Sequence, residues 1–317
     1  MPTEAALSPD ALARIARLDL RARMVVKGFL QGLHSSPLQG FSVQFSEHQK
    51  YNRGDDPARI DWQAYAKTDK YYVKRFEAET NLTGYLAVDL SASMGVRPQS
   101  DASGGGGAES GEGMTKFDYS VCLAASLAYL MTLQQDPVGL VTIGETLRAR
   151  LPPRSRRGHW ADVIATLAKM RPAGRTDLDG SLTRLAAMLR GGSLVMIFSD
   201  LMPSGDSPDD DPIDTLTRCV ARLRHGGSDV IVFHVLDRHE AEFDFEGPIR
   251  FTDAETGDEI TVDADDYRDA YLAELTDYRE SLDASLSRIG ADLVSLHTGM
   301  PFDVALGEYL VGRASRF

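Results

Sequence analysis

The sequence predicts an α/β fold with a doubly wound, mostly parallel central sheet. From residue 85 onwards, short apolar runs typical of strands alternate with longer helical patterns. Runs such as Tyr85–Leu90 are almost continuously apolar, which is typical of strands covered by helices on both faces. The chain has 317 residues and is 43% hydrophobic, so it is long enough for one large domain with an appendage.

The order of the predicted elements supports this fold. Strands are predicted at 85–90, 138–143, 193–199, 230–235 and 293–296. Helices are predicted at 116–135, 160–170, 178–189, 213–223, 267–289 and 304–310. A β-hairpin insertion is predicted at 243–262, where two β-rich runs flank the turn Glu255-Thr-Gly257-Asp.

The first 81 residues differ in character and predict an N-terminal helical and β appendage. They open with a basic amphipathic helix pattern in which Leu12, Ile15 and Leu18 share a face. A β-rich run follows at 71–76. We expect region 1–81 to pack on a main domain at 82–317, in which the Gly- and Ser-rich segment 97–113 forms a flexible loop.

The composition narrows the classes of partner and compartment. The net charge is -13, which opposes binding to nucleic-acid phosphates and suits a cation or a basic partner. The two cysteines, Cys122 and Cys219, are expected to be buried free thiols, which favours the cytoplasm. No membrane span is expected, because the longest nearly apolar run, 120–135, is shorter than the ~20 residues that a span needs.

The sharpest motif is Asp89-Leu-Ser91-Ala-Ser93, directly after the first buried strand. In doubly wound sheets, ligands bind beyond the carboxyl ends of the strands. Two further oxygen ligands, Thr176 and Asp200, follow in the loops at strand ends. Carboxylate and hydroxyl oxygens without thiol or imidazole suit Mg²⁺ or Mn²⁺. The sequence therefore predicts a divalent-cation site.

Structural roles remain open for each of these residues. Ser91 and Ser93 could cap a helix. Thr176 could be an N-cap, with Asp179 completing a capping box. Asp200 could be a turn residue.

These residues carry a family resemblance. Asp89, Ser91, Ser93, Thr176 and Asp200 together resemble the metal-ion-dependent adhesion site of von Willebrand factor A domains. Upstream, the segments Gly54-Asp55-Asp56 and Asp61-Trp62 resemble the family called domain of unknown function 58. This resemblance extends to the Phe245-Glu-Gly-Pro hairpin and the closing helix.

The resemblance implies a function that composition does not show. The family implies a bacterial, non-enzymatic protein-binding module, encoded beside AAA+ ATPases of the MoxR type and acting as their adaptor. It also implies that the serines, the threonine and the aspartates hold Mg²⁺, Mn²⁺ or Ca²⁺, and that a partner carboxylate completes the metal shell.

A second polar cluster lies in the N-terminal region. Its residues include Asp55, Asp56, Arg59, Asp61 and Trp62, followed by Lys67, Lys74 and Glu79. The cluster could be a binding surface, although we favour a salt-bridge network that docks this region on the sheet.

Two enzymatic alternatives compete with the binding module. A serine hydrolase would use Ser93, Asp200 and either His234 or, better placed, His297, but the sequence lacks the first glycine of a nucleophile elbow. A metal nuclease or phosphatase would use Asp55, Asp61 and Glu79, but the negative charge opposes a nucleic-acid substrate.

Overall fold

The structure is a computed structural model of the chain. It describes residues 9–35, 48–50, 72–74, 83–96, 113–156, 158–189, 191–202 and 211–307, with side chains of the first segment described at 13–27. The chain divides into two compact units. One unit comprises Met1–Phe29 together with Leu82–Phe317, and the other comprises Leu30–Asn81. The sequence pattern, in contrast, predicts a single appendage over 1–81.

The smaller unit contains a short antiparallel pair of strands. β1 (His48–Lys50) pairs with β2 (Tyr72–Lys74), with Gln49 opposite Val73. The β-rich run predicted at 71–76 thus contains a strand. The polar cluster from Asp55 to Trp62 lies outside the described residues.

The larger unit is built on a central sheet that has six strands in the described residues. They are β3 (Thr83–Asp89), β4 (Val138–Ile143), β5 (Arg148–Arg154), β6 (Ser193–Ser199), β7 (Asp229–Leu236) and β10 (Asp292–His297). Their order across the sheet is β10-β7-β6-β3-β4-β5. All neighbours run parallel except β4 and β5, which are antiparallel. The predicted mostly parallel α/β fold is confirmed.

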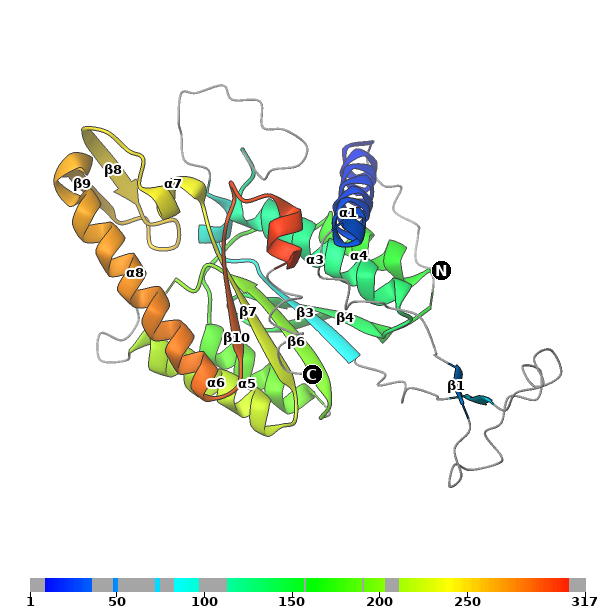
Figure 1. Ribbon diagram of the computed structural model, residues 1–317. Coiled ribbons are helices and arrows are strands. Elements are labelled where there is room, and N and C mark those ends of the chain that lie inside the picture. The colour runs from blue at the N-terminus through cyan, green and yellow to red at the C-terminus, as the bar shows by residue number, and fades with distance from the viewer. Residues whose placement is uncertain are drawn as a thin grey trace, which may run out of the picture. The chain divides into compact units, whose positions relative to one another are not determined.

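Helices cover both faces of this sheet (Figure 1). They are α1 (Pro9–Ser35), α3 (Lys116–Leu133), α4 (His159–Leu167), α5 (Leu178–Met188), α6 (Pro212–His225), α7 (Arg238–Glu242) and α8 (Ala264–Arg288). α3 packs on one face and contacts α4, whereas α5, α6 and α8 form a continuous layer on the other. The layers follow from strands whose side chains are buried on both faces, as the continuous apolar runs predict.

The core lies between the sheet and these helix layers. Leu282 and Leu286 of α8 join the apolar cluster that also includes Val195 and Val232 of the sheet. α3 is buried along most of its length, because its sequence is apolar on nearly every side. It also carries Cys122, which, like Cys219 of α6, is a buried free thiol, as the sequence predicts.

The first helix contacts the main domain through its middle turns. The Trp160 indole donates a hydrogen bond to Asp19 at 2.8 Å. The Arg23 guanidinium lies 5.2 Å from the centre of the Tyr129 ring. α1 therefore lies against α3 and α4, on the layer opposite α8 (Figure 1).

The predicted hairpin is confirmed as β8 (Pro248–Thr252) and β9 (Glu259–Asp263), which are antiparallel. An aromatic cluster anchors its base. Phe243 lies 3% exposed between Phe245, Phe251 and Tyr271, with ring centres 5.4, 6.1 and 4.7 Å away. Its backbone is left-handed, with φ 47°, which is unusual for a bulky residue.

Several elements differ from the prediction. β5 was not predicted because it holds Pro152 and Pro153, which argue against a strand unless it lies at a sheet edge, where β5 is found. α7 was too short to show helical periodicity. The final helix covers 302–307 within the described residues. Residues 97–112 of the predicted flexible loop lie outside the described residues.

Among the described residues, no helix combines the length and the apolarity that crossing a bilayer requires.

Candidate functional site

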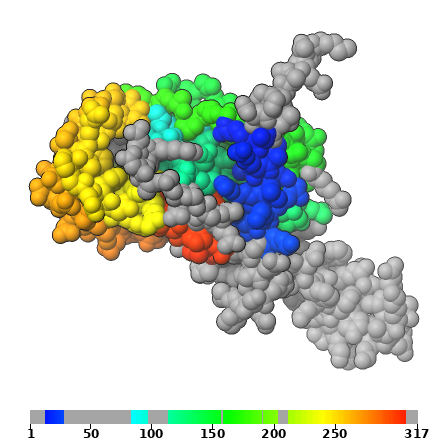
Figure 2. Space-filling view, turned by 90° about the horizontal axis from the view of Figure 1, so that it is seen from above, coloured from blue at the N-terminus to red at the C-terminus, as the bar shows by residue number. Residues whose placement is uncertain are grey.

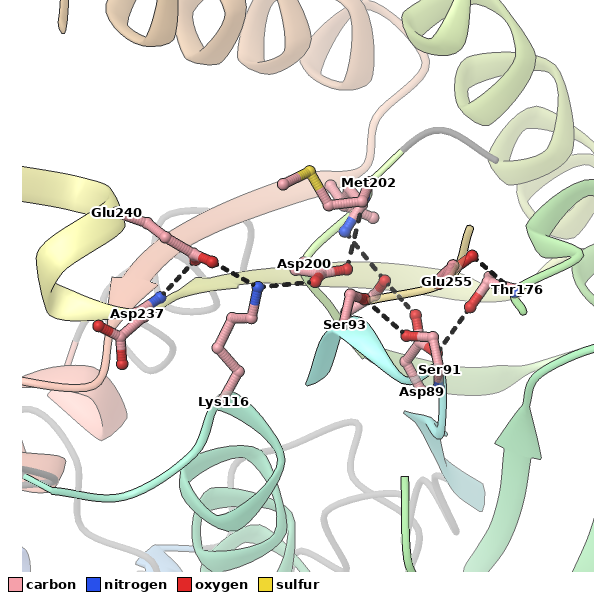
Figure 3. Close-up of polar contacts among 12 residues, drawn as sticks. Asp89, Ser91, Ser93, Lys116, Thr176, Asp200, Met202, Asp237, Glu240 and Glu255 are labelled. Carbon is pink, nitrogen blue, oxygen red and sulfur yellow. Dashed lines mark hydrogen bonds and ion pairs between the residues drawn. The ribbon is translucent and has the colours of Figure 1, made fainter. Parts of the chain in front are cut away.

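The site lies where the winding of the sheet changes direction. β3 is followed along the chain by β4 on one side, and β6 pairs with it on the other. Asp89 is the last residue of β3, and Asp200 directly follows β6. The crevice beyond such a pair of strands is the usual binding position in doubly wound sheets. The five predicted residues all lie at this edge (Figure 3).

Asp89 is the centre of the site and is almost completely buried, at 1% exposure. Its Oδ1 accepts hydrogen bonds from the Ser91 backbone N–H at 2.8 Å and from the Thr176 hydroxyl at 3.1 Å. Its Oδ2 accepts a hydrogen bond from the Ser199 hydroxyl at 2.6 Å. Three separate segments of the chain therefore converge on one carboxylate.

Backbone hydrogen bonds hold the loop of Thr176 against the loop after β3. The Ala92 N–H donates to the Gly174 carbonyl at 2.9 Å, and the Ala173 N–H donates to the Leu90 carbonyl at 2.8 Å. Gly174 has φ +80°, a conformation that residues with a Cβ rarely adopt. The glycine thus allows the turn that brings Thr176 to Asp89.

The capping roles considered from the sequence are filled by other residues. The N-cap of α5 is Asp177, whose side chain accepts from the Gly180 N–H, so the Thr176 hydroxyl is left to bond Asp89. Ser93 begins a short 3-10 turn whose N-cap, Ala92, makes no side-chain cap bond. The hydroxyls of Ser91 and Ser93 instead lie 3.0 Å from each other.

The spacing of these oxygens fits a small divalent cation. Octahedral Mg²⁺ binds oxygens at about 2.1 Å, which places neighbouring ligands about 3 Å apart. The two serine hydroxyls are 3.0 Å apart, and the Thr176 hydroxyl lies 3.1 Å from Asp89 Oδ1. Within the described residues, no three Asp, Glu, His or Cys side chains form a metal-chelating cluster. A cation here would therefore depend on hydroxyl ligands as well as carboxylates.

Asp200 makes a turn contact, because its Oδ1 accepts the Met202 backbone N–H at 3.4 Å. It also has a second partner that the sequence analysis missed. Lys116, the first residue of α3, places its Nζ 2.9 Å from Asp200 Oδ2 and 2.9 Å from Glu240 Oε1. Both Lys116 and Asp200 side chains are 2% exposed. Burial alone disfavours the ammonium charge, but Asp200 and Glu240 outweigh it and raise the pKa of Lys116. The site thus contains a fixed internal cation beside Asp200 (Figure 3).

Glu240 is itself held in place by a capping box. Its other oxygen accepts the Asp237 backbone N–H at 2.9 Å, and Asp237 in turn caps α7. The short helix α7 therefore orients the carboxylate that pairs with Lys116.

A third carboxylate reaches the site from the hairpin. Glu255 Oε2 accepts the Thr176 backbone N–H at 3.4 Å. Burial and the nearby charges of Asp89 and Asp200 raise the pKa of Glu255. In the space-filling view, the yellow surface of the hairpin region borders the cyan surface of residues 83–96 (Figure 2).

Sequence reasoning missed four contributors to this site: Ser199, Lys116, Glu240 and Glu255. One of them carried a usable signal, since a lysine at the first position of a helix opposes the helix dipole and needs a reason. Ser199 directly precedes the predicted Asp200, but no pattern in the sequence marks it as part of the site. Glu240 depends on the capping box of α7, and Glu255 depends on how the hairpin folds back on the sheet.

The hydrolase alternative gains no support from this geometry. The Ser93 hydroxyl bonds Ser91, and in the described part of the chain no histidine is hydrogen-bonded to it. His297 ends β10, and burial lowers its pKa. His234 is buried within β7. The acids of the nuclease alternative, Asp55, Asp61 and Glu79, lie outside the described residues.

The buried Asp89 predicts a pH dependence of stability in EDTA. Burial and the charge of Asp200 raise its pKa from 3.8 to about 6. The folded state therefore binds the proton of the Asp89 carboxyl group more tightly than the unfolded state does. The stability gained from this protonation is complete below about pH 4 and is lost as the pH rises through about 6. We expect the unfolding free energy of the protein, relative to Asp89→Asn, to fall by up to ~3 kcal/mol across this window.

Urea unfolding of both proteins at several pH values between 4 and 8 would measure this. A difference in unfolding free energy between the two proteins that stays constant over this pH range would contradict the prediction. Mg²⁺ should restore the lost stability above pH 6, because a cation binds the ionised carboxylate.

Comparison with known proteins places the chain in a family. A family described as "Protein of unknown function DUF58" matches residues 47–281. The chain is 28% identical over 312 residues to "Uncharacterized protein Mb1516" of Mycobacterium bovis, covering 96% of this chain and 90% of that protein.

Among solved structures, the chain is similar to BatB from Bacteroides thetaiotaomicron, with a TM-score of 0.41 and 12% identity over 74% of this chain and all of that one. It is also similar to the VWA domain of SpRpn10, with a TM-score of 0.37 and 12% identity over 72% of this chain and 94% of that one. Because the family match spans more than half of its residues, the chain belongs to the DUF58 family.

Proposed function

We propose that this chain is a non-enzymatic protein-binding module whose binding depends on a divalent cation. The cation is Mg²⁺ or Mn²⁺, or else Ca²⁺. It is held by the residues predicted from the sequence: Asp89, Ser91, Ser93, Thr176 and Asp200. The observation that carries the proposal is the convergence of hydroxyls from two loops on the buried Asp89, at the spacing of neighbouring ligands of a small cation.

The charges around the site support binding rather than catalysis. Lys116 neutralises part of the charge of Asp200 and Glu240. The hydrogen bonds that the Asp89 carboxylate accepts come from Ser91, Thr176 and Ser199, which carry no charge. A cation bound there would supply an electrophilic site for a carboxylate of a partner protein. Within the described residues, no histidine is hydrogen-bonded to the hydroxyls of Ser91 or Ser93.

The proposed partner is an AAA+ ATPase of the MoxR type, for which the chain would act as an adaptor in bacteria. The family resemblance supports this partner, and the mycobacterial relatives agree with a bacterial role. The proposed compartment is the cytoplasm, because both cysteines are free thiols.

The metal proposal is tested by titrating Mg²⁺ and Mn²⁺ into the protein, Asp89→Asn and Asp283→Asn while following thermal unfolding and heat of binding. Asp283 is an exposed acid of α8 and serves as the control. We expect stabilisation by about 2.7 kcal/mol at a hundredfold excess of cation over its Kd. The protein and Asp283→Asn should show it, and Asp89→Asn should not. An equal shift in all three proteins would refute the site.

The ATPase experiment must separate two requirements for Mg²⁺. One is that of the proposed site, and the other is that of the ATPase, which binds Mg²⁺ with its nucleotide. A co-encoded MoxR-type ATPase should therefore be captured at constant Mg²⁺ on immobilised wild-type protein, Asp89→Asn and Asp283→Asn. Capture by wild type and by Asp283→Asn alone supports the adaptor role. Equal capture by Asp89→Asn shows that the ATPase does not use this site.

A further inference from the structure

The tip of the β8–β9 hairpin turns one acidic side chain inward. All residues from Phe251 to Thr261 are described, and within this stretch Glu255 is the only one that is not exposed. Its carboxylate accepts the backbone N–H of Thr176, the residue whose hydroxyl bonds Asp89. An exposed hairpin therefore directs its one half-buried acid at the proposed cation site (Figure 3).

The turn that carries Glu255 is preorganised. The Asp253 carboxylate accepts the backbone N–H groups of Glu255 at 2.7 Å and Thr256 at 3.1 Å. The ends of the turn are closed by the bond from the Asp253 N–H to the Asp258 carbonyl at 2.8 Å, with Gly257 at φ +79°. The backbone of Glu255 is thus fixed, and only its flexible side chain is free to move relative to the site.

This arrangement brings like charges together. Glu255 approaches a site that already holds the buried carboxylates of Asp89 and Asp200. The ammonium of Lys116 is bound to Asp200 and Glu240, on the side of the site away from Thr176. Carboxylates that converge in a partly buried site repel each other unless a cation lies between them. A cation on the Thr176 side would relieve this repulsion.

We propose that Glu255 is the resident carboxylate of this cation site: a bound divalent cation draws Glu255 in, and a carboxylate of a partner must displace it. The inference rests on the proposed function and adds a ligand and a competitor to it. In the structure the three acids do not form one chelating cluster. Cation binding would close the remaining gap through rotation of the Glu255 side chain, directly or through one water.

The test uses the full chain and Mn²⁺, which reports both affinity and coordinated water. Mn²⁺ is titrated calorimetrically into wild type, Glu255→Gln, Glu259→Gln and Asp89→Asn, and water-proton relaxation is measured on each complex. Glu259 lies on the same hairpin, is half exposed and pairs with Arg250 at 3.5 Å, so it is a matched control. Circular dichroism verifies that each variant is folded.

We expect Glu255→Gln to weaken Mn²⁺ binding on the order of 10- to 100-fold and to raise the relaxation rate, because water replaces the lost carboxylate. Sodium acetate, a probe for a partner carboxylate, should lower that rate in Glu255→Gln at concentrations that leave wild type unchanged. Glu259→Gln should match wild type throughout.

Two other outcomes separate the inference from the proposed function. Unchanged affinity and relaxation in Glu255→Gln, together with loss of Mn²⁺ binding in Asp89→Asn, overturn the role of Glu255 and leave the cation site intact. Absence of Mn²⁺ binding in wild type, or binding that survives in Asp89→Asn, overturns both.

Discussion

Replacing Lys116 with methionine is expected to lower the free energy of unfolding in EDTA by about 3–5 kcal/mol. The ammonium lies 2.9 Å from both Asp200 and Glu240, and Asp200 is 2% exposed. Methionine has a similar length but no charge, so it leaves the buried Asp200 carboxylate without its counter-ion. Breaking a buried pair from one side is costly, because the remaining charge has lost both water and partner.

The same substitution should strengthen cation binding. It removes a positive charge from the site and leaves Asp200 Oδ2 accessible to a cation. We therefore expect Lys116→Met to be less stable than wild type in EDTA and to gain more stability from Mn²⁺. Urea unfolding of both proteins, with EDTA and with saturating Mn²⁺, measures the loss of stability in EDTA and the larger gain from Mn²⁺.

Lys169→Met is the matched control, since Lys169 is an exposed lysine that follows α4. Its unfolding curves should match those of wild type in both conditions. A loss below ~1 kcal/mol for Lys116→Met would show that Lys116 is not paired with buried carboxylates as the structure has it.

Replacing Phe243 with alanine is expected to destabilise the protein by about 3–5 kcal/mol and to loosen the hairpin. Phe243 is buried among Phe245, Phe251 and Tyr271, so truncation leaves a cavity under β8. Hydrogen exchange of the β8 and β9 amides should accelerate more than exchange of the central sheet. Loss of protection confined to other parts of the molecule would contradict this role.

The left-handed backbone of Phe243 gives this prediction a sharper form. Alanine at φ 47° keeps the unfavourable conformation, whereas glycine adopts it without strain. We expect Phe243→Gly to be more stable than Phe243→Ala by about 1 kcal/mol, the reverse of the order found in helices. Phe251→Ala, at a ring that is 36% exposed, should cost less than either.

The fold was predictable because its signals are local. The strands β4 and β6 begin and end where the apolar runs do, and the hairpin follows from the Glu255–Asp258 turn and its flanking β-rich residues. β5 was not predicted because its two prolines have a low propensity for β-strands. They are tolerated because β5 lies at the edge of the sheet.

The candidate site was predictable in part, for a related reason. Asp89, Ser91 and Ser93 stand on one loop after a buried strand, so the topology alone brings them together with Asp200. Lys116 and Glu240 meet through a contact that joins residues 124 positions apart, and no local pattern encodes such a pair. Glu255 reaches the site only because an insertion folds back over the strand ends.

The two prolines of β5 have a consequence for assembly. An exposed edge strand offers free N–H and C=O groups that can template the addition of a further strand from another chain. Pro152 and Pro153 lack the N–H donor, and successive N–H groups of a strand point to opposite sides, so a strand approaching β5 would find the donor missing at one of these positions. The prolines thus protect this edge against aggregation and against fibre-like growth of the sheet. Recognition of a partner by strand addition is therefore disfavoured at this edge.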